Sequence, residues 1–475
     1  LGRSRMIFTQ PLSFITEFVE ELDRGIRQCA PNRKLSTAQR YWLSFCLMGI
    51  LLANQVCWAA FERVGLGGYS QAALSWMFRH GKLLWPLLLN VSILLILNKY
   101  NITEGELVGD DSDRQRAKVT KRIFATSKIF DKKTGGWFNG QTVVLLFLVT
   151  AKVSLPVGFR FYQPDPAVAA WKKTDDALKQ QGVKKSARPP KPEPKAAYPS
   201  KLDVLLALLR EFRAYHPDFS VKAILADALY GSAAWMNQAA RLFPKTQVIS
   251  QLKQTQKVRF RQREMTVAQY FATHPGVAMT LRIRGGQTVP VVLGSARLYV
   301  SAHQQKRWVV ALQYPGEENY RYLVASEMSW RAADVASAYT LRWLVEVFFE
   351  DWKLSEGWGQ LAPQWDEEGS SRGLTLSLLL DHALLLHPQQ QARIENHLPA
   401  CTVGSLQQQS RMDALIDVIR GMVNAEDPHQ RLDELLAVTK RLFPLRDSAK
   451  HMNGRDLGRL EPTPSLKYRA AACMA

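Results

Sequence analysis

Hydrophobic positions in the first hundred residues recur at helical spacing and are interrupted by short breaks rich in Pro, Gly and Asn. Two of the apolar runs, residues 41–60 and 83–98, contain no charged side chain and by length resemble membrane spans. Because charged, helix-like sequence brackets both runs, we expect buried helices of an N-terminal bundle, with a membrane protein as the competing interpretation. The predicted helices are 10–30, 37–62, 70–79 and 82–98.

The pattern changes at residue 102. A short strand at 106–110 ends in acidic residues, and β-rich runs at 142–151 and 157–162 predict a hairpin with a turn at Pro156. Residues 164–200 are polar, basic and rich in proline, which predicts a loop or linker.

Strand and helix patterns then alternate, which predicts an α/β core. Short β runs between residues 252 and 328, divided by Gly, Pro and polar turns, predict an antiparallel β subdomain. One helix at 331–355 follows, and helical patterns continue from residue 371. The alternating elements are helix 202–215, strand 222–227, helix 233–243 and strand 246–250.

The composition indicates what kind of partner the protein binds. The 475 residues carry a formal net charge of +20 and a pI of about 9.8, an excess of Lys and Arg that favours a polyanion such as nucleic acid. The five cysteines show no C-x-x-C spacing, so neither a zinc module nor a disulfide framework is indicated, and a reducing, cytoplasmic setting fits.

Four residues of the helix at 331–355 stand out: Tyr339, Arg342, Glu346 and Lys353. An α-helix places all four within an arc of roughly 60°, apart from most of the apolar residues. A carboxylate among cations suits a site that binds a metal ion and phosphates. The alternative is an amphipathic surface helix with ordinary ion pairs four residues apart.

Acidic residues also end two predicted strands: Asp110 and Asp111 close the first, and Asp227 closes 222–227. Three carboxylates at one sheet edge would bind Mg²⁺ or Mn²⁺ rather than zinc, because all the ligands are oxygens. Two such ions would activate a nucleophile and stabilise the leaving oxygen of a phosphoryl transfer.

The spacing Y-(2)-R-(3)-E-(6)-K is the pattern of a superfamily of bacterial insertion-sequence DDE transposases, and this chain resembles that family. Residues 224–231, ILADALYG, are similar to the family's second aspartate segment, and Asp110-Asp111-Ser112 to its first. The resemblance covers roughly residues 100–355.

The resemblance implies an α/β fold with a ribonuclease H-like catalytic core, interrupted by an antiparallel β insertion. The hydrophobic pattern adds helical N-terminal and C-terminal regions on either side. The expected segments are 1–100 (helical, DNA-binding or bundle), 101–251 (core, with the basic loop 164–200), 252–329 (insertion), 330–362 (helix with the catalytic Glu) and 363–475 (helical, dimerisation or DNA contacts).

The resemblance also implies roles for the candidate residues. Asp110, Asp227 and Glu346 would bind two Mg²⁺ or Mn²⁺ ions, with Asp111 the rival for the first position. The expected DNA contacts are Tyr339, Arg342 and Lys353 near the cleaved end, Tyr230 after the second aspartate, and Trp308 or Trp330 for a flipped base.

The resulting prediction is a cut-and-paste transposase in the bacterial cytoplasm, associated with the nucleoid. It would bind terminal inverted repeats as a homodimer, cleave there, in some cases through DNA hairpins, and join the ends to target DNA. A catalytically inactive DNA-binding relative or regulator of transposition is the alternative.

Overall fold

The computed structural model describes residues 10–116, 123–131, 134–193, 195–361 and 364–444. The chain forms two compact units, residues 1–421 and 422–475. Among the described residues, the second unit contains α15 (Pro428–Leu442) and the last two residues of the preceding helix, and the first contains all the other helices and strands.

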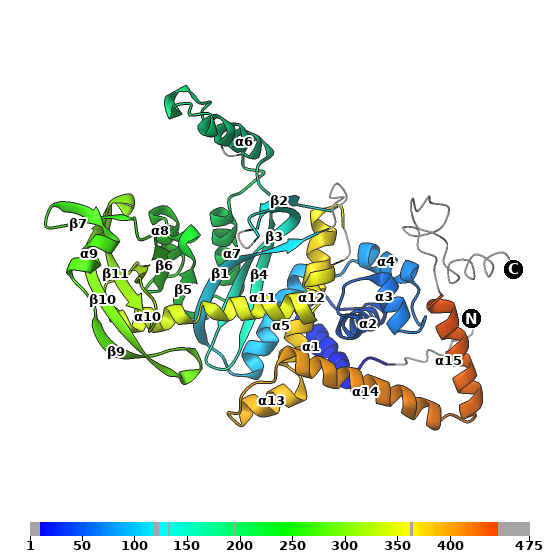
Figure 1. Cartoon of the computed structure of the whole chain (residues 1–475). Coiled ribbons are helices and arrows are strands. Elements are labelled where there is room, and N and C mark those ends of the chain that lie inside the picture. The colour runs from blue at the N-terminus through cyan, green and yellow to red at the C-terminus, as the bar shows by residue number, and fades with distance from the viewer. Residues whose placement is uncertain (1–9, 117–122, 132–133, 194, 362–363, 445–475) are drawn as a thin grey trace, which may run out of the picture. The chain divides into compact units, whose positions relative to one another are not determined.

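Five helices form the N-terminal bundle of the first unit (Figure 1). Their apolar side chains share one core, to which the long helix α12 (Glu367–Leu385) contributes Leu376, Leu379 and Leu380. The predicted helix 37–62 is in fact two helices, separated at Asn54, which adopts a left-handed conformation. The five are α1 (Ser13–Cys29), α2 (Thr37–Ala53), α3 (Trp58–Val64), α4 (Gln71–His80) and α5 (Trp85–Lys99).

The two uncharged runs lie mainly in α2 and α5, and most of α2 is buried in this core. Among the described residues, no single helix is both long and apolar enough to cross a membrane. Only α4 and α5 taken together pass by length and composition, and a bend of 91° separates them.

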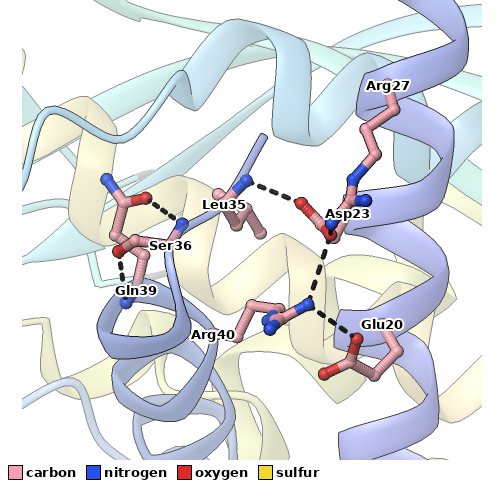
Figure 2. Close-up of polar contacts among 7 residues, drawn as sticks. All are labelled: Glu20, Asp23, Arg27, Leu35, Ser36, Gln39 and Arg40. Carbon is pink, nitrogen blue, oxygen red and sulfur yellow. Dashed lines mark hydrogen bonds and ion pairs between the residues drawn. The ribbon is translucent and has the colours of Figure 1, made fainter. Parts of the chain in front are cut away.

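A buried aspartate joins α1 to the start of α2 (Figure 2). Asp23 is 2% exposed; one of its oxygens accepts from the Leu35 amide at 2.6 Å, and the other pairs with Arg27 and, at 3.3 Å, with Arg40. Arg40 also reaches Glu20 at 3.1 Å. The next residues, Ser36 and Gln39, form a reciprocal capping box that starts α2.

Among the described residues, twelve strands form one sheet, in which the path β2-β3-β1-β5-β6-β12-β11-β10-β7-β8 is extended by β4 beside β3 and β9 beside β10. Among the strands that the structure describes, only the β1–β5 and β5–β6 pairs are parallel. The strands are β1 (Glu104–Gln115), β2 (Thr126–Phe130), β3 (Trp137–Val149), β4 (Ser154–Tyr162), β5 (Ser220–Ala226), β6 (Gln247–Leu252), β7 (Lys257–Phe260), β8 (Arg263–Thr266), β9 (Val277–Arg282), β10 (Thr288–Val300), β11 (Gln305–Gln313) and β12 (Arg321–Ala325).

Helices cover both faces of the sheet. One face packs on α7 (Lys201–Tyr215) and α8 (Ala233–Leu242). The other packs on α10 (Ala332–Thr340) and α11 (Trp343–Ser355). The remaining helices are α6 (Pro166–Gln180), α9 (Val267–Thr273), α13 (Pro388–Glu395) and α14 (Val403–Val423).

The predicted fold class is confirmed: a mixed α/β chain with a large, mostly antiparallel sheet and helices toward both ends, consistent with a ribonuclease H-like domain. Two local predictions were wrong. Pro156 lies inside β4, opposite Phe147 at a shift in register, where a residue without an N–H is tolerated. Residues 166–180, predicted as part of a loop, form helix α6.

Candidate active site

Strand pairing brings Asp110 and Asp227 together. The parallel ladder between β1 and β5 ends at Gly109 and Ala226, so the next residue of each strand is an aspartate. The prediction that the first strand ends at residue 110 was wrong, because β1 continues to Gln115 by pairing with β3. Asp110 and Asp111 therefore sit within a paired strand, where their backbone is held on one side by β3.

Alternation along β1 sends Asp110 and Asp111 to opposite faces of the sheet. Val108, on the Asp110 side, belongs to the core beneath α11, whereas a Cβ at Gly109, on the Asp111 side, would lie 2.2 Å from Leu205 of α7. Asp111 pairs with Lys201 at the start of α7, at 2.6 Å. Only Asp110 therefore faces the helix that carries Glu346.

The single helix predicted at 331–355 is broken between α10 and α11. The amides of Leu341 and Arg342 donate to carbonyls three residues back, at 3.0 and 3.2 Å, which is the tighter 3₁₀ pattern. Tyr339 is consequently buried, and its hydroxyl donates to the Ala226 carbonyl at the end of β5, at 3.2 Å. Tyr339 fixes α10 to the sheet, and Arg342 begins the next helix.

Arg342 bridges two of the three predicted metal ligands. Its Nη1 lies 2.7 Å from Asp110 Oδ2, and its Nη2 pairs with Glu346 Oε1 one turn along α11. Asp110 and Arg342 are 232 residues apart in the chain. The structure thus places Asp110, Glu346 and Arg342 in one ion-paired group, with Asp227 following the neighbouring strand.

The group carries more acid than base. Burial raises the pKa of Asp110 to about 7, Arg342 and the Asp111 amide oppose that rise, and the charges of Asp111 and Asp227 add to it. Burial likewise raises the pKa of Asp111 against the effect of Lys201. Burial would lower the pKa of Arg342, but Tyr339, Asp110 and Glu346 more than offset it, so the guanidinium stays charged.

Tyr230 lies close to the same acids. Its ring is completely buried, and its hydroxyl has no hydrogen-bond partner in the described part of the chain. Burial raises its pKa, and the negative charges of Asp111, Asp110 and Asp227 raise it further. None of the Tyr230 side chain is exposed to a DNA strand in this conformation.

The donor set suits a hard divalent cation, since it consists of carboxylates with an excess of negative charge. Within the described ranges, however, no three Asp, Glu, His or Cys side chains are grouped closely enough to bind a metal ion. The Arg342 guanidinium pairs with one oxygen of Asp110 and one of Glu346 and so lies between the two carboxylates.

The other predicted DNA contacts lie outside the ion-paired group, Lys353 on α11 itself and the two tryptophans on other segments. The ammonium of Lys353 lies 5.8 Å from the centre of the Phe349 ring, two turns beyond Glu346. Trp308 on β11 and Trp330 before α10 are half-buried and pack against the core that includes α10. The structure does not bring either indole into the ion-paired group.

The sequence interpretation missed two residues. Trp343 follows Arg342 directly, is 47% exposed, and has the Arg284 guanidinium 5.4 Å from its ring centre. Helical spacing alone would have placed this exposed aromatic next to the arc that holds Tyr339, Arg342, Glu346 and Lys353. Lys201 is the second residue that the sequence interpretation missed. In the sequence, only its position at the start of α7, directly after the capping residue Ser200, indicated that its side chain has a fixed place.

The fold is consistent with a ribonuclease H-like domain, and comparison with known families agrees. The family described as DDE superfamily endonuclease matches residues 33–308, which is more than half of the chain. The chain belongs to the DDE superfamily endonucleases. Membership in this family implies nuclease activity of the transposase type with DNA as the substrate, and endonuclease domains of this family generally use divalent metal ions.

The match covers Asp110, Asp111 and Asp227 but ends before the segment from Tyr339 to Lys353. A search of curated proteins found no match. The narrower superfamily, the metal count and the roles of individual residues therefore remain predictions.

Proposed function

We propose that this chain is an insertion-sequence transposase of the Y-(2)-R-(3)-E-(6)-K type. It binds the terminal inverted repeats of its element as a homodimer, cleaves there by metal-dependent phosphoryl transfer, in some cases through DNA hairpins, and joins the ends to target DNA. One observation carries the proposal: Arg342 joins Asp110 of β1 to Glu346 of α11, beside Asp227. That arrangement assembles three acids from distant parts of the chain.

Asp110, Asp227 and Glu346 are the proposed ligands of two Mg²⁺ or Mn²⁺ ions. Bound ions would supply an activated nucleophile and stabilise the leaving oxygen. Asp110 is favoured over Asp111 because its side chain lies on the face of the sheet that is covered by α11, the helix of Glu346. Asp111 instead pairs with Lys201 on the other face.

Arg342, Lys353 and Trp343 are the proposed DNA contacts at this edge. A guanidinium suits bidentate phosphate binding, an ammonium a point contact, and an exposed indole the face of a base. Tyr339 acts differently, since its hydroxyl bonds to the Ala226 carbonyl and positions the helix.

The test is cleavage of duplex DNA carrying an element end, with Mg²⁺ or Mn²⁺. Asp227→Asn and Glu346→Gln should each abolish cleavage while DNA binding persists. Glu350→Gln is the matched control, because Glu350 is an exposed carboxylate on the same helix. Full cleavage by both active-site variants would refute the assignment.

The Arg342 bridge also favours a second candidate, a DNA-binding relative that does not cleave, because the guanidinium already neutralises two of the acids. Binding of end DNA by the unaltered chain without cleavage in either metal ion would support that candidate.

A further inference from the structure

Residues 163–200, here called the lysine arm, leave the sheet after β4 and return to it at α7. Helix α6 forms the outgoing half, and none of its fifteen residues is buried. Figure 1 shows α6 standing clear of the sheet. A helix of this length is marginally stable in water unless one side is packed, so contacts within the arm must help to maintain it.

The arm has internal contacts that do so. Asp165 caps α6 through the Ala167 amide at 2.8 Å. The Trp171 indole donates to the Pro189 carbonyl at 2.8 Å, and Arg188 contacts both carboxylate oxygens of Asp175, at 2.9 and 3.0 Å. The proline-rich return is thereby held against one side of α6. Proline also restricts this return to extended conformations, so the arm is a small folded unit.

The outer surface of the arm is basic. Residues 165–200 contain eight basic and four acidic side chains, a net charge of +4. Arg188 and Asp175 compensate each other, and Asp165 is buried. None of the seven lysines forms an ion pair with the described part of the chain. These exposed lysines are Lys172, Lys173, Lys179, Lys184, Lys185, Lys191 and Lys195.

Helical spacing gathers three of these charges. Lys172, Lys173 and Lys179 fall within roughly 120° of the α6 circumference, in an arc that excludes Trp171 and Asp175, which contact the proline-rich return. Asp176 is the only acid within that arc. A stripe of three ammonium groups along about two turns of helix matches the closely spaced charges of a phosphate backbone.

The base of the arm lies beside the acids. Tyr162, the last residue of β4, pairs with Thr142, whose hydroxyl donates to the Asp113 carboxylate of β1. At the other end, Lys201 pairs with Asp111 and lies 5.3 Å from the centre of the Tyr162 ring. Both ends of the arm are therefore fixed to β1 within three residues of Asp110, through Asp111 and Asp113 on the opposite face of the strand.

We propose that the lysine arm binds the phosphate backbone of duplex DNA adjoining the segment held at Asp110, Asp227 and Glu346. This inference rests on the proposed transposase function and adds a second DNA contact to it. A second copy of the chain is the weaker candidate partner, because protein–protein interfaces are depleted in lysine and alanine, which make up seven of the fifteen residues of α6.

The experiment uses the full-length chain with Lys172, Lys173 and Lys179 all replaced by Gln, and a control with the same three replaced by Arg. Gln and Arg are both good helix formers, so α6 should persist, as circular dichroism would verify. Binding to a fluorescent random-sequence duplex is measured by anisotropy over a range of salt concentrations, because a backbone contact needs no specific sequence.

The slope of log K against log salt should fall in magnitude by about 2.7 in the Gln variant, because each phosphate that a lysine neutralises contributes about 0.9 to the slope. The Arg variant should keep the slope of the unaltered chain. An unchanged slope in the Gln variant overturns the proposal. A change in sedimentation mass with an unchanged slope also overturns it and assigns the arm to a second copy.

Cleavage of end-containing duplex by the unaltered chain distinguishes a failure of the arm proposal from a failure of the proposed transposase function. If the unaltered chain cleaves with Mg²⁺ and the Gln variant keeps its salt slope, the arm proposal alone fails. If the unaltered chain binds but never cleaves, the transposase assignment fails whatever the arm does.

Discussion

Asp23 in the N-terminal bundle and Asp110 in the sheet are both buried and both paired with arginine, yet their surroundings differ. Asp23 and Glu20 face Arg27 and Arg40, so that two acids meet two bases, and the Leu35 amide completes the group. Around Asp110, four acids share Arg342 and Lys201. The four are Asp110, Asp111, Asp227 and Glu346.

The difference separates a structural cluster from a reactive one. A buried carboxylate is tolerated when charges and hydrogen bonds compensate it. The Asp23 cluster meets that condition within the chain, whereas the raised pKa of Asp110 shows that its cluster does not. An uncompensated negative charge is what a divalent cation would stabilise, and strongly perturbed acids concentrate at functional sites.

The largest expected effect is on cleavage by Asp110→Asn. Loss of one proposed metal ligand should raise the barrier by about 4 kcal/mol, a rate loss of about a thousandfold. Asp23→Asn should leave the rate per folded molecule unchanged. Asp111→Asn should also retain cleavage, and a greater loss for Asp111→Asn than for Asp110→Asn would reverse the choice between them.

Asp110→Asn should also stabilise the fold at neutral pH in metal-free buffer. A carboxyl whose pKa rises on folding, here from 3.8 to about 7, binds more protons in the folded chain between those values. The free energy of unfolding therefore falls as pH rises through that window and stays low above it.

The rise in pKa corresponds to about 4 kcal/mol at most, so the variant should gain stability up to that limit at pH 8 and little at pH 4. Urea unfolding at both pH values measures the gain. Equal effects of Asp110→Asn at pH 4 and pH 8 would contradict the electrostatic difference between the two clusters.

Asp23→Ala should destabilise the first unit by about 2 kcal/mol, because it leaves the buried Leu35 amide without its acceptor and removes the partner of two arginines. The arginines themselves are partly exposed, which limits the loss. Chemical denaturation followed by tryptophan fluorescence would measure it. Unchanged stability would show that Asp23 is not needed to hold α1 against α2.

The smallest expected effect concerns the capping box next to Asp23. Ser36→Ala removes the side-chain acceptor for the Gln39 amide and should cost about 1 kcal/mol. Ser36→Gly, which should cost only a few tenths of a kcal/mol, is the control. Comparable losses in both variants would point to a change in the unfolded chain instead of a missing cap.

Much of the site could be predicted from local sequence. Asp227 follows a short apolar strand, and the spacing from Tyr339 to Lys353 is readable directly. Helix α6 was missed although Val168, Trp171 and Leu178 have helical spacing, because the neighbouring proline-rich stretch dominated the interpretation. The extension of β1 to Gln115 was missed because its polar residues conceal a strand that is paired with β3.

The break between α10 and α11 could not be predicted locally, since neither Gly nor Pro occurs at residues 341–342. It coincides with two long-range contacts, Tyr339 to Ala226 and Arg342 to Asp110. Nor could spacing alone choose between Asp110 and Asp111. Strand alternation places them on opposite faces, but only the packing of α7 and α11 identifies those faces.

The sequence by itself therefore determined most of the element types, the mixed α/β class and the candidate acids, because hydrophobic periodicity and turn residues act over a few positions. The tertiary structure decided which acids meet, that Arg342 bridges Asp110 and Glu346, and that Tyr339 is buried. Those outcomes depend on strand register and on contacts between residues more than a hundred positions apart, which local spacing does not encode.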